Sequence, residues 1–122
     1  MQKGKTILVV DDEDALRTAL RGELTTKGYT VDTVSDGDEA IAYVQIKPFD
    51  LVILDMKMVR VQGLEVLQYI KKNYPAMKVI MLTAFADLRN AMDSKKFGAD
   101  DFVCKPYDLD DLLSTIAEVM GK

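Results

Sequence analysis

The sequence has no histidine, and it has one cysteine, Cys104, among 122 residues. General acid–base catalysis near neutral pH therefore has no imidazole to draw on, and phosphohistidine chemistry would need a histidine from another protein. A lone cysteine cannot form an internal disulfide, which fits a reducing cytosol. We interpret Cys104 as a buried strand residue rather than a redox centre.

Long apolar segments and basic blocks are also missing. Runs such as Val79–Leu82 are far too short to cross a membrane, and no separate apolar segment with a cleavage site precedes the first strand-like run. We therefore expect a cytoplasmic protein. A net charge of −4 without a basic block argues against binding of nucleic acid or an anionic membrane by this domain alone. The length and the 48% apolar content are typical of one globular domain, expected over residues 1–122.

Short apolar runs alternate with segments of helical periodicity. The expected strands are Thr6–Val10, Tyr29–Val34, Leu51–Leu54, Val79–Leu82 and Phe102–Cys104. Apolar residues at helical spacing predict a helix after each strand. In chain order, the five helices are marked by Leu16, Leu20 and Leu24; by Ala40, Ile41 and Val44; by Leu64, Leu67 and Ile70; by Leu88, Ala91 and Met92; and by Leu109, Leu112 and Ile116. Asp108 is the expected N-cap of the last helix. This alternation predicts an α/β fold with a parallel sheet and helices on both faces.

Polar residues directly follow four of the five expected strands. They are Asp11 and Asp12 after the first strand, Asp55 after the third, Thr83 after the fourth and Lys105 after the fifth. In an open parallel sheet, ligands bind beyond the carboxyl ends of the strands. We therefore expect these side chains to form one site.

The residue types of this set suit phosphoryl chemistry. Two carboxylates about 4 Å apart repel by roughly 4 kcal/mol at an effective dielectric near 20, so the cluster either raises a pKa or recruits a cation. Mg²⁺ prefers such hard oxygen ligands. Lys105 offers a positive charge and Thr83 a hydroxyl to a phosphoryl oxygen. A carboxylate between a metal ion and a lysine is a plausible nucleophile towards phosphorus.

Each residue taken alone also has a simpler interpretation. Acidic residues before a helix, such as Asp11 and Asp12, interact favourably with the helix dipole. Asp55 could cap a strand end, and Thr83 could be a β-branched strand residue without a functional role. Lys105 could be an ordinary solvated lysine. Phe102 is most simply a core or half-buried aromatic residue. The interpretation as a single functional site is wrong only if all of these simpler interpretations apply at once, at matching strand ends, and that combination is improbable.

Four segments together resemble response regulator receiver domains of bacterial two-component signalling. They are Ile7–Glu13, Phe49–Met56, Val79–Ala84 and Gly98–Tyr107, and the resemblance covers essentially the whole chain. It implies a (βα)5 flavodoxin-like three-layer sandwich whose five parallel strands lie in the order 2-1-3-4-5, with helices on both faces.

The resemblance also implies a role for each residue of the site. Asp55 would be the phosphoacceptor, and Asp11, Asp12, Asp55 and the backbone carbonyl of Lys57 would bind Mg²⁺, for which Mn²⁺ could substitute. Thr83 and Lys105 would bind the phosphoryl group, Thr83 and Phe102 would act as switch residues, and the bond before Pro106 would be cis.

The implied function is a phosphorylation-activated switch rather than an enzyme with an external substrate. A sensor histidine kinase or phosphotransfer protein would donate the phosphoryl group. The surface of the fourth helix, fifth strand and fifth helix would then regulate an output partner, and dimerisation on phosphorylation is compatible with the family. The sequence names neither the kinase nor the target, and leaves open whether an effector domain follows.

One loop departs from the family pattern. Val59 stands where proline is usual, and Gln62 stands where Asp or Asn is common. Lys57 and Arg60 add positive charge near the acceptor, and we hypothesise that they alter the lifetime of the phosphoryl group.

Three other functions fit less well. A phosphohydrolase of the haloacid dehalogenase type carries an Asp two residues after its nucleophile, where this chain has Lys57. A flavodoxin-type cofactor domain needs a hydroxyl- or glycine-rich phosphate loop, whereas residues 11–14 are acidic and would repel phosphate. A degenerate receiver acting only as a scaffold is disfavoured because Asp55, Thr83 and Lys105 are all present.

Overall fold

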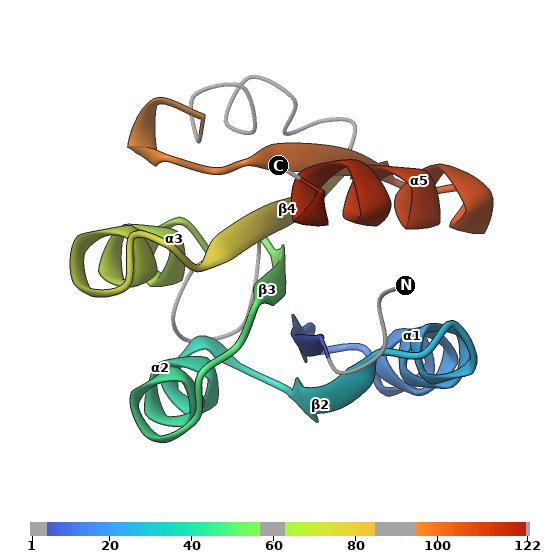
Figure 1. Ribbon diagram of the computed structural model, residues 1–122, viewed down its shortest axis with the longest axis horizontal. Helices are drawn as coiled ribbons and strands as arrows, with labels where there is room; N and C mark the ends of the chain where they lie inside the picture. The colour runs from blue at the N-terminus through green and yellow to red at the C-terminus, as the bar shows by residue number, and fades with distance from the viewer. Residues whose placement is uncertain (1–4, 57–62, 85–94, 122) are drawn as a thin grey trace.

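The computed structural model describes residues 5–56, 63–84 and 95–121. A parallel sheet of five strands crosses the middle of the molecule, in the order β2-β1-β3-β4-β5 (Figure 1). The strands are β1 (Thr6–Val10), β2 (Thr30–Val34), β3 (Leu51–Asp55), β4 (Lys78–Ala84) and β5 (Asp101–Lys105). The predicted fold class and strand order are confirmed.

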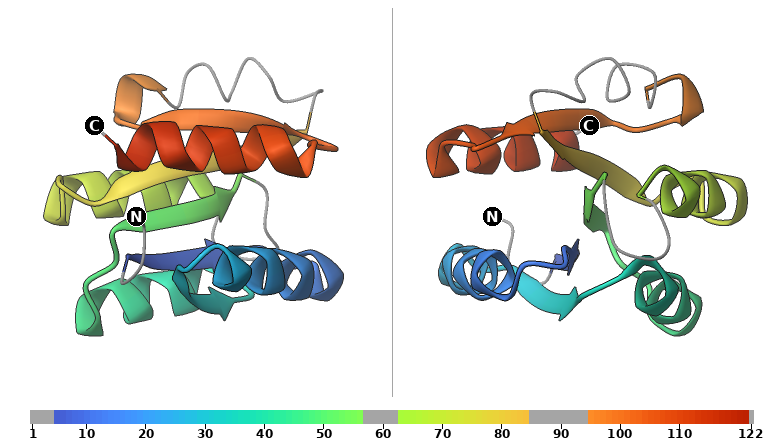
Figure 2. Two further views of the ribbon diagram at one scale, coloured as in Figure 1. Left: turned by 45° about the vertical axis from the view of Figure 1, so that its right-hand side comes forward. Right: turned by 180° about the vertical axis from the view of Figure 1, so that it is seen from behind.

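Helices cover both faces of this sheet. They are α1 (Asp14–Thr26), α2 (Gly37–Ile46), α3 (Gly63–Asn73) and α5 (Leu109–Met120), with a short 3-10 helix, η2 (Lys95–Phe97), before β5. Helices α1 and α5 lie on one face and α2 and α3 on the other (Figure 2). The expected helix carrying Leu88, Ala91 and Met92 falls outside the described residues.

The central strands are apolar throughout because both of their faces are covered. In β1, Ile7 and Val9 pack towards α1 and α5, whereas Leu8 and Val10 pack towards α2 and α3. Strand side chains alternate between the two faces, so one short segment contributes to both cores. This packing fixes the register of the strands and hence the position of each strand end.

The prediction that Cys104 is buried was wrong. Cys104 is half-buried rather than buried, as is every residue of β5. The reason is position in the sheet, because β5 pairs with β4 on one side only.

The start of α2 depends on its N-cap. Asp36 precedes the helix, and its Oδ1 accepts a hydrogen bond of 2.9 Å from the Glu39 amide. We expect Asp36→Ala to lower the free energy of unfolding by about 1 kcal/mol, because a helix-end amide loses its acceptor. Asp36→Asn, which keeps an acceptor oxygen, should retain most of the stability. Urea denaturation of the two variants tests this, and equal losses would contradict a capping role.

Candidate functional site

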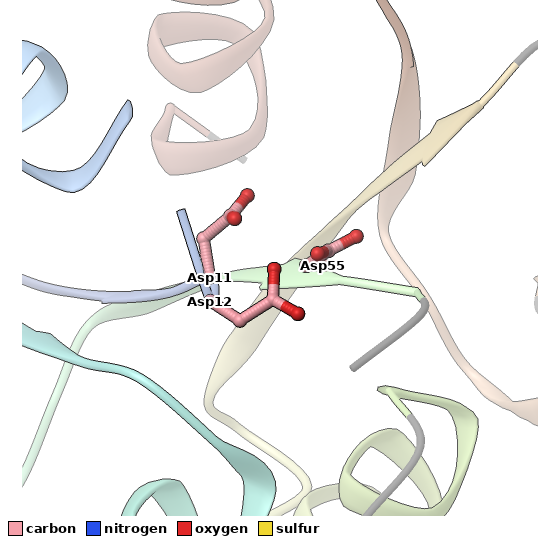
Figure 3. Close-up of side chains that lie close together, drawn as sticks. All are labelled: Asp11, Asp12 and Asp55. Atoms are coloured by element: carbon pink, nitrogen blue, oxygen red, sulfur yellow. The ribbon is translucent and has the colours of Figure 1, made fainter. Parts of the chain in front are cut away.

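Three aspartates converge at the carboxyl ends of two neighbouring strands. Asp11 and Asp12 directly follow β1, and Asp55 is the last residue of β3. Figure 3 shows the three side chains grouped at this edge. One carboxylate oxygen from each lies within 4.8 Å of the other two. The structure therefore brings together the acidic residues singled out by the sequence.

The two acids after β1 differ sharply in their surroundings. Asp11 is completely buried, whereas Asp12 is exposed. The Oδ1 atom of Asp11 accepts a hydrogen bond of 2.9 Å from the Glu13 amide, and its backbone carbonyl accepts one of 2.6 Å from Arg17. Asp11 is thus held in one orientation, while the Asp12 carboxylate faces solvent.

Lys105 ties the acidic cluster to the fifth strand. Its ammonium donates to Asp11 Oδ2 at 2.9 Å and lies 3.6 Å from Asp55 Oδ2 and 3.6 Å from Glu13 Oε1. Burial lowers the pKa of Lys105, but the hydrogen bond to Asp11 and the negative charges of Asp55, Asp11 and Glu13 outweigh burial and raise the pKa overall. The ammonium therefore stays protonated beside Asp55. The peptide bond from Lys105 to Pro106 is cis.

The donor set fits a hard divalent cation. Three carboxylates and one ammonium leave a formal charge of −2 at the cluster (−3 + 1). Thiols and imidazoles are missing from it, and two of the carboxylates are shielded from bulk water. Mg²⁺ binds through one or two carboxylates and keeps several waters, so Asp12 with Asp55 or Asp11 could hold it. Lys57, whose carbonyl was predicted as a further ligand, falls outside the described residues.

Thr83 and Phe102 lie on the neighbouring strands β4 and β5. Thr83 is 1% exposed, and its hydroxyl oxygen lies 3.7 Å from Met56 Sδ and 3.2 Å from the Ala84 carbonyl. The half-buried Phe102 packs against the core on the α2 and α3 face, with the Lys95 ammonium 5.9 Å from its ring centroid.

Two residues of the site had no structural role assigned from the sequence pattern. Tyr107 is one: burial, with the nearby charge of Asp11, raises its pKa to about 12, so its phenol stays neutral. Gly63 is the other, because its amide donates to the Met56 carbonyl at 2.9 Å and an added Cβ would lie 2.2 Å from the Asp55 carbonyl oxygen. The requirement for a glycine here comes from a close approach of α3 to the end of β3, which periodicity does not reveal.

Of the hollows on the described surface, two flank different ends of the sheet. A groove of about 390 Å³ beside the acidic cluster is lined by Glu13, Leu16, Lys105, Pro106 and Tyr107. A larger groove of about 560 Å³ lies where α2 ends and β4 begins, and includes Phe49 and Tyr74. Because the larger groove contains none of the acidic cluster, it is not the reactive centre.

Known proteins resemble the chain in both sequence and structure. Residues 7–117 match the model of the response regulator receiver domain. The transcriptional regulatory protein ZraR of Salmonella typhimurium is 38% identical over 99% of this chain and 28% of its own length. The response regulator ArlR of Staphylococcus epidermidis is 35% identical over 95% of this chain and 52% of its own length. The chain thus spans between about a quarter and a half of these two curated relatives.

Solved structures give the same result. The receiver domain of NtrX from Brucella abortus superposes with a TM-score of 0.89 at 33% identity, covering 95% of this chain and 98% of that one. Chemotaxis protein CheY4 of Vibrio cholerae has a TM-score of 0.88 at 31% identity, with 94% and 98% covered. Among the described residues, no helix combines the length and apolar character that a membrane crossing requires. With its acidic cluster at the ends of β1 and β3 and a family match over residues 7–117, the chain belongs to the response regulator receiver domains of two-component signalling.

Proposed function

We propose that this domain is a Mg²⁺-dependent switch in which Asp55 accepts a phosphoryl group from the phosphohistidine of a sensor histidine kinase or phosphotransfer protein. The observation that carries this proposal is the placement of Asp55. Its carboxylate lies among the other two aspartates and 3.6 Å from the Lys105 ammonium. A carboxylate so placed has a positive charge and two further candidate metal ligands close to it.

In the proposed reaction, an Asp55 carboxylate oxygen attacks phosphorus and forms a P–O bond. The P–N bond of the phosphohistidine breaks, and its electron pair stays with the leaving imidazole of the partner. Lys105 pairs with a phosphoryl oxygen, and the Thr83 hydroxyl donates to another. Mg²⁺ held by Asp11, Asp12, Asp55 and the Lys57 carbonyl would neutralise charge on the transferring group, and Mn²⁺ has the same oxygen preference.

The phosphoryl group would then act as a switch signal. It would add negative charge close to Thr83 and Lys105, near the carboxyl ends of β4 and β5. We propose that Thr83 moves towards the phosphate, that Phe102 turns inward, and that the surface formed by α5, β5 and the segment preceding β5 changes. A coupling free energy of about 1–3 kcal/mol would suffice to alter binding of an output partner or a second copy of the domain.

The direct test is incubation of the protein with acetyl phosphate, followed by intact-protein mass spectrometry. One phosphoryl group should be added in the presence of Mg²⁺ or Mn²⁺, and chelation of the metal with EDTA should prevent the addition. Hydroxylamine, which cleaves acyl phosphates, should remove the group. Addition that persists in EDTA, or that resists hydroxylamine, would contradict an aspartyl phosphate formed with a metal ion.

Lys105 should oppose metal binding while it supports phosphorylation. In Lys105→Met the acidic cluster loses its ammonium, so we expect Mg²⁺ affinity to rise about tenfold and the phosphorylation rate to fall about a hundredfold. The metal-free protein should lose roughly 1–3 kcal/mol of stability, because Asp11 remains buried without that donor. Calorimetric Mg²⁺ titration, acetyl phosphate kinetics and urea denaturation measure these three changes.

Lys72→Met, an exposed change on α3, is the matched control and should alter none of these three quantities. Weaker Mg²⁺ binding in Lys105→Met would show that the ammonium does not compete with the cation.

A further inference from the structure

We propose that Met56 is a positioning residue that holds the Thr83 hydroxyl in the unphosphorylated protein and so sets how readily the domain is phosphorylated. This inference rests on the proposed phosphoacceptor role of Asp55. It assigns a regulatory task to the residue that follows the acceptor.

The backbone of Met56 is fixed on two sides. Its amide donates to the Leu82 carbonyl of β4 at 2.8 Å, and its carbonyl accepts from the Gly63 amide of α3 at 2.9 Å. The side chain is 6% exposed and belongs to the core between the sheet and helices α2 and α3. The position of the thioether is therefore determined by β3, β4 and α3 together.

The hydroxyl of Thr83 is buried and must find an acceptor. It lies 3.7 Å from Met56 Sδ and 3.2 Å from the carbonyl of the next residue, Ala84. A hydroxyl has one hydrogen, so it donates to one of these acceptors at a time. Thioether sulfur is a weak acceptor that competes with the Ala84 carbonyl, so the bond to Met56 biases the orientation of the hydroxyl and still breaks easily.

A phosphoryl group on Asp55 would change this balance. Its charged oxygens accept hydrogen bonds about twice as strong as those of a neutral acceptor. Thr83 would then leave Met56 for the phosphate. The bond to sulfur exists only before that step, so it stabilises the unphosphorylated state and opposes the switch.

Met56 also connects Thr83 to the aromatic residue on the next strand. Phe102 pairs with Met81 across β4 and β5 and packs against the same core that contains Met56. Once released from Thr83, the thioether can repack within that core. The Met56 side chain thus contacts Thr83 and lies in the core against which Phe102 packs, and these are the two residues of the proposed switch.

A double-mutant cycle isolates the contact. Met56→Leu removes the sulfur and keeps an apolar side chain of similar volume, whereas Thr83→Val removes the hydroxyl and keeps the shape. With acetyl phosphate and Mg²⁺, Met56→Leu should reach half-maximal phosphorylation at an acetyl phosphate concentration about two- to fivefold lower. In the Thr83→Val background, the same change should have no effect. Met81→Leu, a fully buried methionine of the same core, is the matched control and should show no dependence on Thr83.

A spectroscopic measurement tests the contact without any phosphorylation. In protein labelled at the methionine methyl groups, Thr83→Val should shift the Met56 methyl resonance, and phosphorylation of the wild type should move it in the same direction. The inference would be overturned if Met56→Leu changed the half-maximal acetyl phosphate concentration equally with and without the Thr83 hydroxyl. It would also be overturned if Met81→Leu reproduced the effect of Met56→Leu. Wild-type protein that takes up no phosphoryl group would instead refute the proposed function, and the methyl shift would still decide whether Met56 holds Thr83.

Discussion

Replacing Asp55 with asparagine is expected to reduce phosphorylation by acetyl phosphate by more than about a hundredfold, to the background of the assay. An amide oxygen is a poor nucleophile, and the neutral side chain also removes one of the three proposed metal-binding carboxylates. The fold should tolerate the change. Repulsion from Asp11 and Asp12 is lost together with the attraction to Lys105, so the free energy of unfolding should stay within about 1 kcal/mol of the wild type.

Asp50 provides a matched control for this variant at the opposite end of β3. Its Oδ2 atom accepts a hydrogen bond of 2.8 Å from the Thr6 amide, and an asparagine oxygen can replace that acceptor. Asp50→Asn should therefore be phosphorylated at the wild-type rate. Rapid, metal-dependent phosphorylation of Asp55→Asn would place the acceptor elsewhere, and peptide mapping would then identify it.

The second large effect is expected from adding a single methyl group at Gly63. A Cβ there would lie 2.2 Å from the Asp55 carbonyl oxygen and 2.8 Å from Met56 Cα, both backbone atoms that cannot move alone. We expect Gly63→Ala to lower the free energy of unfolding by about 3 kcal/mol. Protein that still folds should be phosphorylated about a hundredfold more slowly, because the end of β3 has to shift and an ångström of misplacement can cost that much.

Gly22→Ala is the matched control, with the opposite sign. Gly22 lies in the exposed face of α1, and its added Cβ would meet no heavy atom within 4 Å apart from its adjacent residues and the backbone of its own helix. Alanine is favoured over glycine inside a helix, so this variant should gain roughly 0.5–1 kcal/mol and keep its phosphorylation rate. Urea denaturation and acetyl phosphate kinetics on both variants provide the comparison. Similar stability of Gly63→Ala and wild type would mean that α3 can move away from β3 at little cost.

The elements of this fold were predictable because they depend on short-range periodicity. Runs such as Leu51–Leu54 are apolar at every position, and a strand covered by helices on both faces requires this. The strand ends could also be placed. All carboxyl ends of a parallel sheet meet at one edge, so the order of strands and polar residues was enough to predict that Asp11, Asp55 and Lys105 lie together.

The environment of each residue was not predictable in the same way. The strand order implied by the family resemblance already places the fifth strand at the sheet edge, but it does not specify how much of each residue there is covered, and Cys104 is half-buried. The bond of Lys105 to Asp11 at 2.9 Å, rather than an equally short one to Asp55, depends on how β1 and β5 are spaced across the sheet.

The amino-acid sequence alone determined the α/β class and the set of polar residues at the strand ends, because both follow from patterns within a few neighbouring residues. Tertiary packing decided which acid is buried, which hydroxyl meets the sulfur of Met56 and why residue 63 must be glycine. Those properties depend on distances between segments that are remote in the chain, and such distances are set only when both faces of the sheet are packed.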